Sequence, residues 1–252
     1  VQNSAFNRRV TALTEVDISG PAKGHALLKT KYSIDGTRTR GTLNNCGTGK
    51  TPWGSFLTGE ENWFGYFTRP AGDNLARGND KSVVALNRYG RAEGAASRHG
   101  WETAGTADIY ARWINAKTGT STDGTDDYRN EMNGMGYIVE MDPYKPTSRM
   151  VKRTGLGRFA HESAAFSLPK AGEKLAVYMG DDARNEYIYK FVSDTAWSAA
   201  DANPTDRLAT GAKYLDSGKL YVAKFASDGT GRWIELNLAA IPSTYTAYAF
   251  AD

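Results

Sequence analysis

The sequence has only one cysteine, Cys46, among 252 residues. A single thiol excludes an internal disulfide, so packing, alone or with bound metals, must stabilise the fold. So few cysteines also suit an exported bacterial protein. The chain has no apolar run approaching the roughly 18 residues of a membrane helix, and its polar start, Val1-Gln2-Asn3-Ser4, lacks a signal-peptide pattern. The sequence therefore predicts no membrane insertion.

Charge of one sign is not concentrated anywhere in the chain. Its 31 basic and 28 acidic residues give a formal net charge of +3. Without a block of like charges, the sequence gives no support for nucleic-acid binding. A mildly basic surface is compatible with anionic substrates.

Several common catalytic motifs are missing as well. There is no Gly-x-Ser-x-Gly nucleophile elbow. The letters GKT at 49–51 resemble a phosphate-binding loop, but Asn44 stands where that loop needs glycine, and Pro52 and Trp53 replace the helix start. These departures exclude ATP binding of that type. The adjacent carboxylates of Glu60 and Glu61 could not flank a glycosidic bond.

The composition favours a folded, turn-rich chain, with 40% hydrophobic residues, 12% aromatic residues and 27 glycines. Short runs rich in β-branched and aromatic residues, bounded by turn formers, predict strands at 10–16, 25–34, 55–58, 63–68, 137–141, 174–180, 187–192, 219–225 and 232–237. The last two should form a hairpin through Asp228-Gly229. This pattern predicts an all-β fold, with residues 1–252 as a single domain or segment and a loop-rich excursion around 84–130. The acidic cluster at 118–127 lacks the ligand spacing of an EF-hand loop.

Residues 41–66 contain the most informative segment, GTLNNCGTGKTPWGSFLTGEENWFGY. Turn-forming neighbours predict that Cys46 lies on a loop rather than in an apolar core. A thiolate and carboxylates that converge on one site would suit a metal centre with mixed ligand preferences. Since successive side chains of an extended segment point in opposite directions, only one of Glu60 and Glu61 should reach such a site. We expect Glu61 to reach it and Glu60 to form a structural salt bridge.

The chain resembles the PhoX-type alkaline phosphatases. Their hallmark is similar to NNCxGGxTPWGTxLTCEEN followed later by Gly-Arg-Phe-x-His-Glu. This sequence matches it at Asn44-Asn45-Cys46, Thr51-Pro52-Trp53-Gly54, Leu57-Thr58, Glu60-Glu61-Asn62 and Gly157-Arg158-Phe159-Ala160-His161-Glu162. It departs from the family at Gly59, where many relatives have a second cysteine, and at Asn185, where an aromatic residue is common. The resemblance extends from about Asn7 to Phe191, and it implies that the chain is an internal part of a longer phosphatase.

The resemblance implies a β-propeller, only part of which would lie in this chain, and a mixed iron and calcium cluster. By resemblance, Cys46 binds iron, Glu162 binds iron with a bridge to calcium, and Glu61 binds calcium or bridges. Asn62 and Arg158 would contact a phosphate monoester substrate. The implied location is periplasmic or secreted, and the remainder of the parent protein is an expected partner.

Three further residues have open roles in this scheme. His161 should point away from the Glu162 side if the stretch is extended, which favours a structural role. Asp181 and Asp182 follow an apolar strand, where a functional loop and a turn cap are equally good interpretations. The alternative for the whole chain is a non-catalytic propeller fragment or binding module without an assembled active site.

Overall fold

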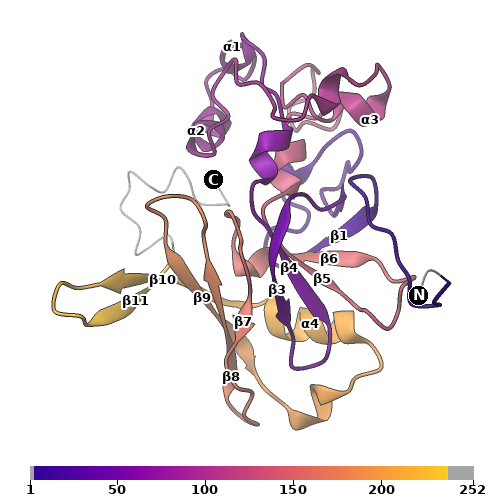
Figure 1. Ribbon diagram of the computed structural model, residues 1–252. Coiled ribbons are helices and arrows are strands. Elements are labelled where there is room, and N and C mark those ends of the chain that lie inside the picture. Colours follow the sequence, from indigo (N-terminus) through magenta and orange to yellow (C-terminus); the bar gives the residue numbers. More distant parts are fainter. Residues whose placement is uncertain (1–2, 238–252) are drawn as a thin grey trace.

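A computed structural model describes residues 3–237. Two β-sheets dominate it, with few helices, in agreement with the predicted all-β class (Figure 1). The part of the chain that the structure describes has eleven strands: β1 (Glu15–Ser19), β2 (Arg38–Arg40), β3 (Asn45–Lys50), β4 (Phe56–Glu60), β5 (Ile138–Met141), β6 (Met150–Arg153), β7 (Ala165–Phe166), β8 (Lys174–Gly180), β9 (Ile188–Ala196), β10 (Gly218–Phe225) and β11 (Gly231–Glu235).

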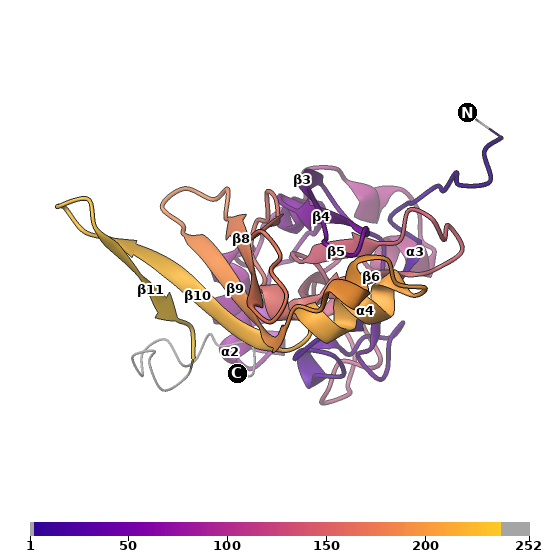
Figure 2. The same ribbon diagram turned by 90° about the horizontal axis from the view of Figure 1, so that it is seen from below.

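The first sheet has the order β2-β1-β6-β5-β4-β3. Its β1–β6 pair is parallel and its other pairs are antiparallel. The second sheet is antiparallel throughout, in the order β11-β10-β9-β8-β7. Its β10–β11 hairpin projects from the body of the molecule (Figure 2). The predicted Asp228-Gly229 turn is confirmed, since Gly229 has φ of 83° and the Ala226 N–H donates to the Thr230 carbonyl.

The main hydrophobic core lies between the two sheets. The first sheet and its β3–β4 turn contribute Trp53, Leu57 and Ile138, and the second contributes Val177 and Phe191. Tyr214 and Leu215 of helix α4 (Arg207–Leu215) complete the core, and Asp206 caps that helix by accepting from the Ala209 N–H. This shared core packs the sheets together on either side of the candidate site.

Between β4 and β5 the chain forms a strand-free excursion with its own core. The excursion carries short helices: η2 (Trp63–Tyr66), α1 (Asp73–Ala76), α2 (Lys81–Arg88), η3 (Trp101–Thr103), α3 (Asp108–Ala111) and η4 (Glu131–Gly134). Its core contains the buried residues Trp63, Phe67, Leu86, Trp113, Met132 and Met135, and Leu43, which precedes β3, packs with them. The remaining short helices are η1 (Ala26–Leu28), η5 (Thr154–Leu156) and η6 (Ala199–Ala202). Within residues 3–237, no helix is both long and apolar enough to cross a lipid bilayer.

Three predicted strands are wrong or displaced. The 10–16 run overlaps only the start of β1, and the 25–34 run contains η1, which His25 caps by accepting from the Leu27 N–H. The 63–68 run forms η2 instead. Trp63 at the start of η2 and Phe67, the extended residue directly after it, are both fully buried in the excursion core, so tertiary packing overrides the β propensity of this run. The other six predicted strands coincide with β4, β5, β8, β9, β10 and β11 to within a few residues.

Candidate metal centre

The β3–β4 hairpin carries Cys46 at an irregular point. The register runs from Asn45 opposite Glu60 to Thr48 opposite Thr58, so one extra residue of β3 is accommodated between them. This bulge includes Cys46 and Gly47, and bulges commonly redirect a side chain beside a functional site. The prediction of a loop at Cys46 is therefore wrong, because pairing with β4 makes this turn-like sequence a strand. Its thiol is nevertheless exposed.

The side chains of Glu60 and Glu61 point in different directions at the end of β4, as the alternation of side chains along a strand predicts. The Glu60 side chain is fully buried and lies 2.9 Å and 3.0 Å from the Lys152 ammonium. This salt bridge confirms the structural role expected of Glu60. Sequence reasoning missed Lys152, because only the register of β5 and β6 brings it to Glu60.

Glu162 is brought to the hairpin by a segment between the two sheets. The His161 N–H donates to the Glu60 carbonyl at 2.9 Å, and the Glu162 N–H donates to the Gly180 carbonyl at 3.3 Å. These bonds attach the segment to β4 on one side and to β8 on the other.

The His161 ring is buried and does not join the donor cluster. It packs on Phe159 with ring centroids 3.6 Å apart, and burial lowers the pKa of His161 to about 3. The imidazole is therefore neutral at physiological pH. His161 supports the site from the core, in keeping with the structural role expected for it.

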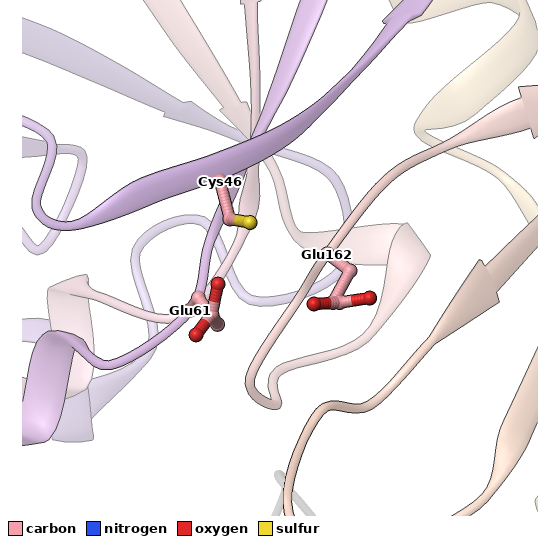
Figure 3. A group of neighbouring side chains, drawn as sticks. All are labelled: Cys46, Glu61 and Glu162. Carbon is pink, nitrogen blue, oxygen red and sulfur yellow. The ribbon is translucent and has the colours of Figure 1, made fainter.

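Cys46, Glu61 and Glu162 converge on one point. One donor atom from each, the thiol sulfur and a carboxylate oxygen of both glutamates, lies within 4.8 Å of the others. Figure 3 shows the three side chains directed into a common space, from β3, from the end of β4 and from the segment before β7. Glu61 is 9% exposed, whereas Cys46 and Glu162 are open to solvent. A ligand could reach this cluster from outside.

The electrostatics of the cluster favour a bound cation. A hydrogen bond to Glu61 is the main cause that raises the pKa of Cys46, followed by burial and by the charges of Glu61 and Glu162. Within residues 3–237, buried cations pair with the carboxylates of Glu60 and Glu140, and no lysine or arginine forms an ion pair with Glu61 or Glu162. A cation would relieve the repulsion among these groups and favour the thiolate. The donor set fits the implied metals, because thiolate suits iron and carboxylates suit calcium.

Asn62 and Arg158, the two predicted substrate contacts, have different hydrogen-bond partners in this structure. The Asn62 amide lies beside the cluster and donates to Glu61. The Arg158 guanidinium donates to the carbonyls of Met135 at 2.9 Å and Met132 at 3.0 Å, and it packs over Trp63. Asn62 is thus adjacent to the donor atoms, while Arg158 is engaged with the excursion. Both substrate roles stay predictions.

Asp181 forms a turn at the end of β8. Its carboxylate accepts from the Ala183 N–H at 3.0 Å, and burial raises its pKa to about 6. Asp182 donates its N–H to the Ala160 carbonyl. The turn cap, one of the two interpretations of these aspartates, is thus present. Neither aspartate belongs to the cluster of Cys46, Glu61 and Glu162.

Two sheets that together bring one thiol and two carboxylates to a common point define the chain as a β-sheet protein with a candidate metal centre. The sequence profile described as "Alkaline phosphatase PhoX" matches residues 1–251. The chain belongs to this family.

One solved structure, "Pseudomonas fluorescens PhoX in complex with vanadate, a transition state analogue", is similar at 38% sequence identity with a TM-score of 0.75. The match covers 94% of this chain and 37% of that chain. The present sequence thus spans little more than a third of that relative. No curated protein matches the chain.

Proposed function

We propose that this chain provides metal ligands of an alkaline phosphatase that hydrolyses phosphate monoesters. The convergence of Cys46, Glu61 and Glu162 within 4.8 Å carries the proposal. Membership of the PhoX family supports it, as does the similar structure, which is a complex with vanadate, a transition-state analogue. Because the chain spans 37% of that relative, residues from a longer protein would contribute to the complete site.

The proposed cofactors are iron and calcium. Cys46 would bind iron as a thiolate, Glu162 would bind iron and bridge to calcium, and Glu61 would bind calcium or bridge. Bound polyvalent cations neutralise charge that builds on phosphoryl oxygens and make water more acidic. The part of this chain is to hold the three donors close together, two of them exposed to solvent. Asn62 would donate to a substrate oxygen beside Glu61, and Arg158 is a second proposed substrate contact.

The proposed architecture is one β-propeller domain, of which the two sheets would form a part. The twisted antiparallel sheet β7–β11 with its hairpin supports this proposal. We also propose a periplasmic or secreted location, from family membership, and association with the remainder of a longer parent chain.

Hydrolysis of 4-nitrophenyl phosphate by the purified chain, loaded with iron and calcium, tests the activity. We expect the donors present in this chain to support nitrophenolate release, at a rate below that of a complete site, and we expect this release to be lost on chelation and in Glu162→Gln. Glu173→Gln is the matched control, because Glu173 is exposed in a surface pair with Lys170. Metal binding without hydrolysis would support the alternative that this segment is a non-catalytic scaffold, and equal rates in both variants would contradict the proposed site.

A further inference from the structure

Two glycines of β3 lie directly against the segment that carries Glu162. A methyl group on Gly47 would lie 1.8 Å from the Glu162 carbonyl oxygen, and one on Gly49 would lie 2.1 Å from that of Ala164. Both obstacles are backbone atoms, which cannot rotate away as a long side chain can. Figure 1 shows β3 and β7 side by side although they belong to different sheets.

We infer that Gly49 is a positioning residue of the metal centre. Its lack of a side chain permits the close approach of the two sheets that brings Glu162 to Cys46. The inference rests on the proposed function in so far as the cluster binds metal.

The volume of an added side chain, rather than the backbone conformation, is what makes a substitution at residue 49 disruptive. Gly49 has no left-handed φ, so alanine is conformationally allowed at this position. Ordinary non-bonded contacts lie near ~3.5 Å, so the added methyl group would push the Ala164 backbone away by about an ångström or more. Glu162 lies two residues before Ala164 and would move with it. Cys46 and Glu61 directly follow Asn45 and Glu60, which the β3–β4 pairing holds opposite each other.

Gly49→Ala tests the inference, with two control variants. Gly180→Ala is the open control, since a methyl group there meets no atom within 4 Å. Gly218→Ala is the crowded control, since its methyl group would lie 2.4 Å from the Val192 carbonyl oxygen in the second sheet. Thermal unfolding and the affinity for added iron are measured for each. We expect Gly49→Ala to bind iron at least about tenfold more weakly than the parent. Gly218→Ala should lower stability and leave the affinity unchanged.

A metal-free readout separates this inference from the proposed function. Glu162→Cys creates a second thiol opposite Cys46, and dibromobimane becomes fluorescent when it links two thiols. We expect efficient linking in Glu162→Cys and at least fivefold less when Gly49→Ala is added. If the parent binds no iron, the proposed metal centre fails, while the linking yield still decides the positioning role.

A second condition covers loss of folding in Gly49→Ala. If this variant is unfolded in buffer, the linking yield of both proteins is measured in trimethylamine N-oxide, which strengthens apolar burial and restores folding. A reduced linking yield in the folded variant supports the inference. A parent-like yield in folded Gly49→Ala protein, or a variant that trimethylamine N-oxide refolds with a parent-like yield, would overturn it.

Discussion

The Lys152 ammonium lies 2.9 Å and 3.0 Å from the two carboxylate oxygens of Glu60, and neither side chain is exposed. The same carboxylate accepts the N–H groups of Leu43 and Gly136, so it joins the entry to β3, the end of β4 and the start of β5. These bonds fix the backbone at Glu60, and the side chain of Glu61, the next residue, extends from there toward Cys46. The buried pair orients the candidate metal centre without belonging to it.

Removal of the Glu60 carboxylate should destabilise the fold severely. Glu60→Ala would leave the Lys152 ammonium buried without its partner, a change that costs about 3–5 kcal/mol. Urea unfolding measures the loss. The exposed pair of Lys219 and Glu235 provides the control, and Glu235→Ala should cost below about 1 kcal/mol. Equal losses in the two variants would refute a special role for the buried pair.

Trp53 should contribute through its indole N–H as well as its ring. The N–H donates to Glu140 at 2.8 Å, and the ring stacks on Tyr214 with centroids 5.5 Å apart. Trp53→Phe retains an aromatic ring but removes a buried donor, so we expect a loss of about 1–3 kcal/mol in the free energy of unfolding. Trp233→Phe, on the projecting hairpin, should change it by less than about 0.5 kcal/mol. A parent-like unfolding midpoint for Trp53→Phe would contradict this assignment.

Substitution of Arg158 distinguishes a structural role from a substrate contact. Its guanidinium already donates to two carbonyls of the excursion, so Arg158→Ala should lower the free energy of unfolding by about 2 kcal/mol or more. Chemical denaturation and vanadate binding are measured together. Weaker vanadate binding at unchanged stability would instead establish the substrate contact alone.

Asp181 should make stability fall as pH rises from about 4 to 6. Its folded pKa of about 6 exceeds the ordinary value of 3.8, so the folded state holds the proton more tightly in this window. Above pH 6 the carboxylate is charged in both states, and the cost of its burial is fully present. Asp181→Asn keeps the oxygen that caps the turn and cannot ionise, so it should be more stable than the parent at pH 7 and similar near pH 4.

Urea midpoints across this pH range measure the effect. Asp228→Asn on the exposed hairpin is the control, because hydrogen bonds to Thr230 lower the pKa of Asp228 and so produce no loss of stability between pH 4 and 6. A constant difference between Asp181→Asn and the parent from pH 4 to 7.5 would contradict the raised pKa.

Local sequence patterns predicted those parts of the fold that depend on neighbouring residues. The strand at 174–180 coincides with β8, and the alternation rule correctly separated Glu60 from Glu61. The motif resemblance singled out Cys46, Glu61 and Glu162, which the fold indeed brings together.

The features that escaped prediction depend on residues distant in sequence. Turn-like residues around Cys46 form a strand because β4 pairs with them. The close contacts of Gly47 and Gly49 exist only because the fold brings residues 162–164 against β3. Residues Trp63–Tyr66 form a helical turn because the rings of Trp63, at its start, and Phe67, directly after it, are both buried in the excursion core. Lys152 reaches Glu60 through sheet register. No short stretch of the sequence contains the information on these long-range contacts.

Elemental analysis of iron and calcium per chain, on protein purified without chelators, tests the metal centre most directly. We predict near-stoichiometric iron in the parent, iron lost in Cys46→Ala, and iron unchanged in Gly180→Ala. Folded parent protein without iron, or Cys46→Ala with as much iron as the parent, would contradict a metal centre built on Cys46, Glu61 and Glu162.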